Sequence, residues 1–288
     1  MTTTLPVPAQ SLTKSQQMQV INLVRRAAKS EIMPRFQNLS SVDIMTKSRE
    51  DDLVTEADLA SEAMISRGLA RLFPSALIVG EEAVAKNAKL RTVMAEHEFA
   101  FVIDPIDGTW NYAKGIPLFG VILSVLRFGT PIFGLLYDPI MDDYIVADDT
   151  DAATSLARAN GRSHGLRTSS VTAPEKMNGY IHFGLMPKED QAKLAPVLPQ
   201  FLRTTSLRCS CHEYRILAQG HVEFILSSTL NPWDHAAGIL ACQKAGGVAA
   251  FIGDRAPYNA KQTTGYLLCA SSQEAWDTVA RIVEPALS

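Results

Sequence analysis

The chain has 288 residues, 47% of them hydrophobic, so it is long enough to bury a large core in one domain or in two halves. Its 27 basic and 30 acidic residues give a net charge of −3, without a lysine- or arginine-rich block. This composition excludes a disordered chain, and we expect no nucleic-acid partner. The longest uncharged apolar run, Gly115 to Leu126, is shorter than the roughly 18 residues that a membrane span needs, so we expect no membrane partner either.

The N-terminus and the cysteines indicate a compartment. Residues 1–11 lack the basic and apolar regions of a signal peptide, which predicts a cytoplasmic protein whose four cysteines are reduced thiols. Cys209, Cys211 and His212 form a Cys-x-Cys-His cluster. Structural zinc sites usually draw their ligands from two separated pairs, so we do not expect zinc here.

Helices packed on a largely antiparallel sheet are expected in the first half. Apolar residues at helical spacing predict a helix over Ser11 to Met33, and a charged loop follows at 46–52. Thr55 and Asp58 then fit a capping box that opens a second helix, which ends near Pro74. The expected strands are Ala76 to Val79, Phe99 to Ile103, Val121 to Phe128, Ile132 to Tyr137 and Tyr144 to Ala147, with a hairpin between the third and the fourth.

A domain boundary is expected in the loop-like stretch from Asp148 to Ser170, which divides the chain into residues 1–150 and 151–288. Beyond it, strands alternate with helices, and this pattern predicts an α/β second half. The expected strands are Tyr180 to Leu185, Phe224 to Leu226, Gly247 to Ile252 and Tyr266 to Ala270. The expected helices are Glu189 to Leu202, Glu213 to Ala218, Trp233 to Ala245 and Gln273 to Val283.

One expected strand runs into the sequence Asp-Pro-Ile-Asp-Gly, which holds two carboxylates close together. Pro105 fixes its own φ, and Gly108 permits a tight turn after Asp104 and Asp107. Such carboxylates repel each other unless a cation lies between them, so the pair suits a divalent metal with oxygen ligands. Backbone N–H groups from Gly108 onward would suit a phosphate. A solvated acidic turn is the simpler alternative.

Two further carboxylates are candidates for the same place. Glu81 follows another expected strand, and it lies beside Asp104 if the two strands are neighbours; Glu82 is interpreted as a surface residue. Asp234 begins a helix, where the helix dipole alone explains an acidic residue. Small residues after it would let that helix approach another element closely and bring the carboxylate into a cleft. His235 points about 100° away and is interpreted as structural.

Four motifs together resemble the inositol monophosphatase superfamily of Mg²⁺-dependent, lithium-sensitive phosphatases. They are Asp104 to Thr109, Asp52 to Asp58, Gly80-Glu81-Glu82, and Trp233 to Gly238 leading to Ala245-Gly246-Gly247. The order and spacing of these motifs agree with those of the family over roughly residues 40 to 250. The resemblance implies an α+β or α/β fold, a layered α-β-α-β-α sandwich of the inositol monophosphatase and fructose-1,6-bisphosphatase type, with the metal site between the halves. It also implies a homodimer.

The resemblance further implies the roles of individual residues. The metal ligands for two or three Mg²⁺ ions would be Glu81, Asp104, Asp107, Asp234 and the carbonyl of Ile106. The catalytic residues would be Thr109, Asp58, Glu81 and Lys47: Thr109, held by Asp58, orients the attacking water, and Lys47 belongs to a mobile loop over the metals. By local sequence alone, Asp58 is only a capping partner and Lys47 a solvated lysine. The backbone of Gly108 and Thr109 would bind the phosphate.

Two departures from the family pattern concern the substrate. Enzymes selective for inositol usually have a glutamate seven residues before the aspartate of the Trp-Asp motif, where this chain has Ser227. Arg208 begins a segment that usually reads Gly-Ser-Ala, and it is either an anion contact or a structural ion pair. Arg208 and Ser227 are therefore the candidate substrate-binding residues beside the phosphate-binding turn.

The expected activity is Mg²⁺-dependent hydrolysis of a small polyol-type phosphate, similar to inositol 1-phosphate, by a metal-activated water. Histidinol phosphate, fructose 1,6-bisphosphate and adenosine 3′,5′-bisphosphate are alternative substrates. A regulatory protein on the same fold is the non-enzymatic alternative. Every position expected to supply a side-chain ligand holds a carboxylate, which favours an enzyme.

Overall fold

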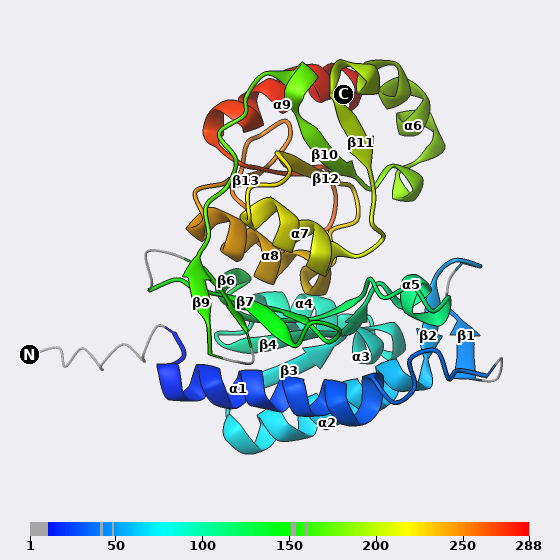
Figure 1. The fold of residues 1–288 in the computed structure, drawn as a ribbon, viewed down its shortest axis with the longest axis vertical. Coiled ribbons are helices and arrows are strands. Elements are labelled where there is room, and N and C mark those ends of the chain that lie inside the picture. Colours follow the sequence, from blue (N-terminus) through cyan, green and yellow to red (C-terminus); the bar gives the residue numbers. More distant parts are fainter. Residues whose placement is uncertain (1–10, 41–42, 48, 151–153, 159–160, 288) are drawn as a thin grey trace, which may run out of the picture.

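The structure, a computed structural model, describes residues 11–40, 43–47, 49–150, 154–158 and 161–287. Its layers alternate between helices and sheets, so that two sheets are separated by one helical layer and covered by two others (Figure 1). This arrangement confirms the predicted α-β-α-β-α sandwich. No helix in the described ranges is long and apolar enough to cross a bilayer.

Three pairs of helices form the helical layers. They are α1 (Lys14–Ala27) with α2 (Glu56–Leu72), α7 (Ser210–Ala218) with α8 (Pro232–Lys244), and α6 (Lys188–Leu194) with α9 (Gln273–Leu287). The first helix continues through a π-helical turn, Ala28–Ile32, and so fills most of its predicted range. The short helices are α3 (Glu81–Lys86), α4 (Lys89–Glu96) and α5 (Thr109–Ala113). Short 3₁₀ turns occupy Pro174–Lys176, Phe183–Leu185 and Ala195–Gln200.

The first sheet has seven strands in chain order and is antiparallel except for its first pair. The strands are β3 (Leu77–Gly80), β4 (Ala100–Asp107), β5 (Gly120–Arg127), β6 (Thr130–Asp138), β7 (Asp143–Asp148), β8 (Ser155–Arg158) and β9 (Ser163–Gly165). The predicted hairpin is confirmed as β5 and β6. The prediction of a loop over 148–170 is wrong for β8 and β9, so this sheet runs past residue 150. The domain division remains a prediction.

The second sheet has five strands, in the order β11-β10-β12-β14-β13. They are β11 (Arg203–Thr205), β10 (Asn178–Ile181), β12 (Phe224–Ser227), β14 (Leu267–Ala270) and β13 (Val248–Phe251). The strand β10 is parallel to both of its neighbours, β11 and β12. The strand β14 is antiparallel to both of its neighbours, β12 and β13. The helix predicted over 189–202 ends early, because Pro196 and Pro199 favour the 3₁₀ turn that follows α6. A separate two-stranded ribbon, β1 (Ile44–Thr46) and β2 (Leu53–Thr55), flanks the charged loop.

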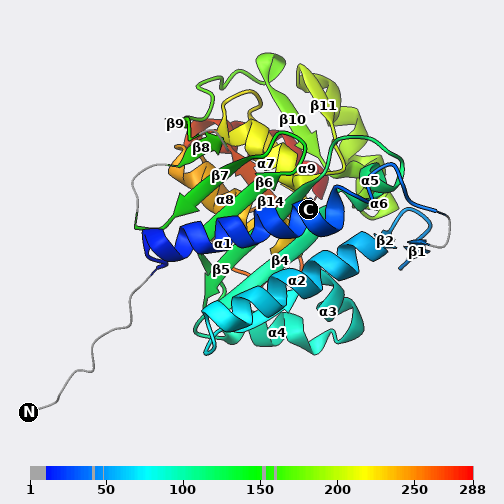
Figure 2. The same cartoon turned by 60° about the horizontal axis from the view of Figure 1, so that its bottom comes forward.

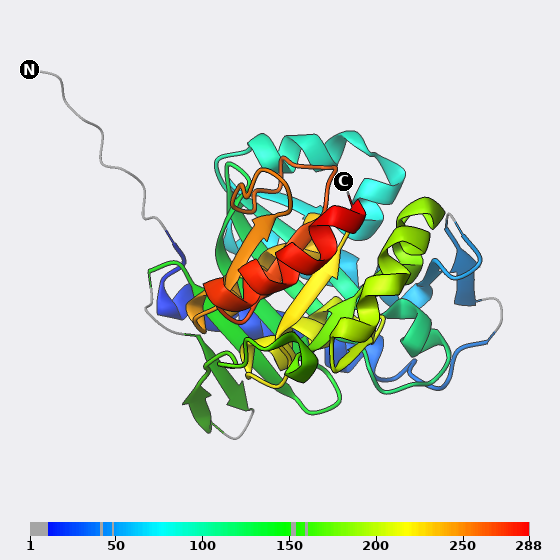
Figure 3. The same ribbon diagram turned by 90° about the horizontal axis from the view of Figure 1, so that it is seen from above.

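Three apolar cores lie between the layers. Along β4, Phe101 and Ile103 belong to the core under α1 and α2, which lie side by side across the sheet (Figure 2). Val102, between them, belongs to the core under α7 and α8. This alternation is that of a strand buried on both faces. The outer face of the second sheet is covered by α9 (Figure 3).

The middle core is shared by both sheets. It contains Val102 and Leu136 from the first sheet, Ile225 and Leu267 from the second, and Ala237 from α8 between them. Because one core serves both sheets, the two sheets pack on opposite sides of the layer that contains α8.

Candidate active site

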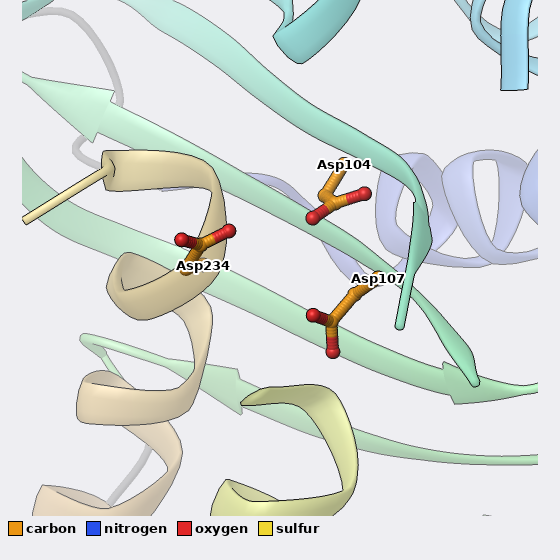
Figure 4. A group of neighbouring side chains, drawn as sticks. All are labelled: Asp104, Asp107 and Asp234. Carbon is orange, nitrogen blue, oxygen red and sulfur yellow. The ribbon is translucent and has the colours of Figure 1, made fainter. Parts of the chain in front are cut away.

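Three aspartates meet where β4 and α8 come together. Each of Asp104, Asp107 and Asp234 offers a carboxylate oxygen, and these oxygens all lie within 4.8 Å of one another. Figure 4 shows the first two on the strand side and the third on the first turn of α8, directed toward a common space. Asp104 and Asp107 are buried, with 2% and 8% of their surface exposed, and Asp234 is half-buried.

A bulge in β4 explains how two aspartates of one strand reach the same face. Residues three apart in a regular strand point to opposite faces of the sheet. Asp104 pairs with Ile122 and Asp107 with Gly120, so β4 contains one residue more than β5 between these pairs. Such an extra residue turns the following side chain to the other face. Pro105 lies within the bulge, where it has no ladder hydrogen bond to donate.

The third aspartate depends on close packing between helices. Pro232 opens α8, and Asn231 before it donates its side-chain amide to Asp234 over 3.2 Å. Gly238, one turn later, lies against α7: a Cβ on it would be 2.1 Å from Cγ of Tyr214. The close approach that the small residues predicted therefore occurs, and α7 is the partner. His235 points away and bonds Tyr214 Oη and the Thr229 carbonyl.

The electrostatics of the three carboxylates favour a bound cation. Burial and three neighbouring carboxylates raise the pKa of Asp104 well above its ordinary value, and burial with neighbouring carboxylates does the same to the pKa of Asp234. Burial raises the pKa of Asp107 to about 6, although the Cys211 backbone N–H bonds it. No lysine or arginine of the described ranges forms an ion pair with any of the three. Carboxylate oxygens at this spacing that have no ion-pair partner suit a hard divalent ion such as Mg²⁺.

Glu81 lies beside this cluster at the end of the parallel neighbour strand. The register pairs Gly80 with Ile103, so the predicted adjacency of the two strands is confirmed. Glu81 lines the same cavity as the aspartates, and its charge raises the pKa of Asp104. Its carboxylate bonds Lys47 Nζ at 2.8 Å and lies outside the three-aspartate group. A metal ligand role for Glu81 remains a prediction.

Lys47 is not the solvated lysine that its local sequence indicates. Its side chain is 16% exposed, and Nζ also bonds Glu82 at 2.5 Å. Burial lowers the pKa of Lys47, but the two glutamates outweigh it and raise that pKa overall. Glu82 is buried as well, which corrects its interpretation as a surface residue. The carboxylate of Glu62 accepts the N–H groups of Glu82 and Ala83 and so fixes the start of α3.

Thr109 and Asp58 form the predicted pair. Thr109 Oγ1 lies 3.1 Å from Asp58 Oδ1 and 2.8 Å from the carbonyl oxygen of Ile106. Asp58 Oδ2 accepts the N–H and the hydroxyl of Thr55, which confirms the capping box. Burial raises the pKa of Asp58 to about 7, although the Thr55 hydrogen bonds lower it. Gly108, which precedes Thr109, has φ +86°, the left-handed conformation that favours glycine.

The cysteines and the histidine of the Cys-x-Cys-His cluster contact other protein groups. All four cysteines are free and buried. Cys209 Sγ lies 3.1 Å from Asp107 Oδ2, and His212 Nε2 bonds the carbonyl of Phe119. In the described ranges the three aspartates form the only group of metal-binding side chains, and the Cys-x-Cys-His cluster is not part of it.

A cavity of about 610 Å³ opens over the aspartates, a volume typical of a small-molecule site. Its lining includes the predicted Glu81, Ile106, Gly108, Thr109 and Arg208. The sequence reasoning missed others: Arg49, Trp110, His182 and Asn231. His182 directly follows β10, which ends at Ile181, whereas the expected strand from Tyr180 to Leu185 placed this histidine inside the strand; the rule used for Glu81, a polar residue at the end of an apolar strand, therefore did not find it.

Ser227 lies behind His182 and does not line this cavity. It is 1% exposed, and its hydroxyl bonds the Thr229 carbonyl and His182 Nδ1, each at 3.0 Å. The other ring nitrogen of His182 bonds Glu213 Oε2 at 2.6 Å. Burial lowers the pKa of His182, but Glu213 raises it overall. Substrate contact by Ser227 remains a prediction that would require His182 to move.

Comparisons with known proteins agree with this arrangement. The sequence profile described as "Inositol monophosphatase family" matches residues 14–286. The chain is 27% identical to "Nus factor SuhB" of Xylella fastidiosa over 252 residues, which cover 84% of this chain and 85% of that protein. It is 30% identical to the inositol-1-monophosphatase of Synechocystis sp. over 216 residues, 71% of this chain and 69% of that one. A solved IMPase from Thermotoga maritima shares the fold, with a TM-score of 0.78, 21% identity, and coverage of 94% and 98%.

Proposed function

The chain belongs to the inositol monophosphatase family, and from this premise we propose that it is a Mg²⁺-dependent phosphomonoesterase for a small phosphate ester. The observation that carries the proposal is the convergence of Asp104, Asp107 and Asp234 on one cavity, where none of the three forms an ion pair with a lysine or arginine of the described ranges. A doubly charged phosphate would be repelled by such a cluster unless cations were bound there. The family is one of phosphatases, and this site has the donors that their metals need.

The proposed metal ligands are the three aspartates, Glu81 and the carbonyl of Ile106. Bound Mg²⁺ would supply Lewis acidity, screening the charge of the phosphate and making a water acidic near neutral pH. Lys47 holds Glu81 in place through its 2.8 Å bond. Glu62 fixes the turn from which Glu81 projects.

Thr109 is proposed to orient the attacking water, with Asp58 acting through it. The Thr109 hydroxyl has one proton to donate, and its two acceptors are Asp58 Oδ1 at 3.1 Å and the carbonyl oxygen of Ile106 at 2.8 Å. A lone pair of Oγ1 is then available to accept a hydrogen bond from water. The backbone of Gly108 and Thr109, which lines the cavity beside them, is proposed to bind the phosphate.

Three features of the proposal rest on the family resemblance and the sequence alone: inhibition by lithium, a homodimer, and a location in the cytoplasm. Inositol 1-phosphate, histidinol phosphate, fructose 1,6-bisphosphate and adenosine 3′,5′-bisphosphate are the candidate substrates.

The test is release of inorganic phosphate from these four compounds with and without Mg²⁺. We expect Mg²⁺-dependent release by the wild type and its loss in Asp104→Asn, because that change removes one charged ligand. Asp138→Asn is a matched control: Asp138 is also buried, but it accepts the N–H groups of Ile140 and Met141 in a turn that does not line the cavity. Near-normal turnover in Asp104→Asn would reject the metal assignment.

A second candidate is a regulatory protein on the same fold. It is supported by the relatives whose name is Nus factor SuhB, including the one from Xylella fastidiosa. The intact aspartate cluster favours the enzyme, since a purely regulatory protein has no need of three carboxylates that raise one another's pKa. A folded protein without activity on any of the four compounds would favour the regulatory role.

A further inference from the structure

The cavity wall contributed by residues 182–234 is nearly free of accessible negative charge. Among the described residues that line it, Asp234 is the one carboxylate from this segment, and it belongs to the metal cluster. The remaining arginine or lysine of this wall is Arg208, and the wall also contains the imidazole of His182. Phe183, Leu185 and other uncharged groups complete the wall. Because the reactive phosphate belongs at the aspartates, this wall faces the rest of the substrate.

The imidazole of this wall offers no free ring nitrogen to a neutral polyol. Both ring nitrogens of His182 have partners, Glu213 and Ser227. Glu213 is fully buried, and its other oxygen accepts the N–H of Leu207 at 2.7 Å. Ring hydroxyls of a polyol would therefore find no accessible carboxylate on this wall apart from Asp234; the exposed carboxylate of Asp51, which also lines the cavity, belongs to the charged loop and is paired with Arg208.

Arg208 is instead accessible and held at the edge of the phosphate-binding turn. Its carbonyl oxygen would lie 3.3 Å from a Cβ on Gly108, so the two segments abut. The guanidinium carbon stacks 4.3 Å above the ring of Trp110, in the helix that starts at this turn. The backbone of Arg208 has φ +54°, an uncommon conformation for a side chain of this size. The side chain is 44% exposed.

The present partner of Arg208 is easily exchanged. Its guanidinium lies 3.2 Å from Asp51, which is 43% exposed and also pairs with Arg49 at 3.2 Å. An exposed ion pair contributes little to stability. A phosphate or carboxylate group can take both hydrogen bonds of a guanidinium, which is a stronger arrangement. The carboxylate of Asp51 therefore occupies the position on Arg208 that an anionic group of a ligand could take.

We infer that the substrate of the proposed phosphatase carries a second anionic group, a phosphate or a carboxylate, on the part that leaves, and that Arg208 binds this group. The inference rests on the proposed function and narrows its substrate class. It favours bisphosphates and phosphorylated acids over inositol 1-phosphate, whose leaving alcohol is neutral, and histidinol phosphate, whose leaving alcohol is cationic.

The first experiment compares matched substrates with Mg²⁺ present. Fructose 1,6-bisphosphate and fructose 1-phosphate differ in a second phosphate, and 2-phosphoglycerate and glycerol 2-phosphate differ in a carboxylate. We expect kcat/KM to be at least about tenfold higher for the anionic member of one or both pairs, and the pair that responds identifies the group. Equal or faster turnover of both neutral members would overturn the inference and leave the phosphatase intact. Lack of release from all four would overturn the proposed function, and this inference with it.

The second experiment separates anion binding from a structural role. Arg208→Gln should lower kcat/KM for the preferred anionic substrate by about 10- to 100-fold, mainly through KM, and leave its neutral partner unchanged. Asp51→Asn should act in the opposite direction and lower KM, because it frees Arg208. If both variants instead reduced turnover of both substrates equally, the ion pair of Arg208 with Asp51 would have a structural role only, and the inference would be wrong.

Arg255→Gln is the matched control for these variants. Arg255 also has a left-handed backbone, with φ +57°, and also stacks on a tryptophan, Trp276, at 5.1 Å. It pairs with Asp277 at 3.0 Å, as Arg208 pairs with Asp51, but it does not line the cavity. Its replacement should change neither KM nor the preference between substrates, and an equal loss in this variant would contradict a specific role of Arg208.

Discussion

Replacement of Asp58 by asparagine tests the electrostatics of the site through stability. Asparagine keeps the size of the side chain and one carbonyl oxygen, so the cap at Thr55 can persist. The change removes the ionisable group, whose pKa burial raises from 3.8 to about 7, with the Thr55 hydrogen bonds opposing and the charges of Glu82 and Glu81 adding to it. With only 1% of Asp58 exposed, solvent screens it little.

The sign and size of the effect follow from linkage. A carboxyl whose pKa is higher in the folded state binds its proton more tightly there, so its contribution to stability is complete below about pH 3.8 and is lost as the pH rises through about 7. The full shift corresponds to about 4 kcal/mol, of which about 2.3 kcal/mol is lost between pH 5 and 7, because the group is still half protonated at pH 7. The Asp58→Asn variant lacks this pH-dependent contribution to the free energy of unfolding. Relative to the wild type, the variant should therefore gain about 2.3 kcal/mol in free energy of unfolding from pH 5 to 7.

Urea unfolding at pH 5, 6, 7 and 8 in the presence of a chelator measures this difference. Asp142→Asn is the control, because Arg25 lowers the pKa of Asp142 to about 2 and the group stays ionised throughout this range. Its difference from the wild type should not change with pH from 5 to 8. A difference for Asp58→Asn that is equally flat would refute the reasoning.

Two further predictions concern catalysis and metal binding. Thr109→Ala removes the hydroxyl that contacts Asp58 and should lower kcat by about 100-fold or more while Mg²⁺ affinity stays similar; an unchanged kcat in a phosphate-release assay would count against its role. Mg²⁺ should raise the melting temperature over that in chelator at pH 8, and this gain should shrink toward pH 5, since protons compete for carboxylates such as Asp107, whose pKa is about 6. A gain that does not depend on pH would contradict metal binding by these aspartates.

The sequence predicted those helices and strands that are specified by residues close together in the chain. Thr55 and Asp58 are three residues apart, and their capping box forms as expected. Long apolar strands such as β5 were found because they are buried on both faces. The short strands β1 and β9 were missed, since they are largely exposed, lack apolar alternation and exist only through pairing with a neighbour.

The candidate site was predicted less from local patterns than from the motifs of a family. The expected neighbourhood of Glu81 and Asp104 followed from two strands ending in acids, and the register confirms it. The burial of Lys47 and Glu82 was missed because charge in a short segment indicates a solvated loop. Each buries its charge only because the other is present, a pairing across 35 positions that composition does not reveal.

The helical layer between the two sheets has a consequence for how substitutions will behave. Asp234 lies one turn before Gly238, where α8 touches Tyr214 without room for a methyl group. Any enlarged side chain at this contact must push α8 away from α7, and Asp234 moves with its helix. Such a variant would lose affinity for metal while the chain still folds. In a mutational scan, the positions at which substitution lowers activity most would therefore include residues of the buried core between α7 and α8 as well as residues of the cavity.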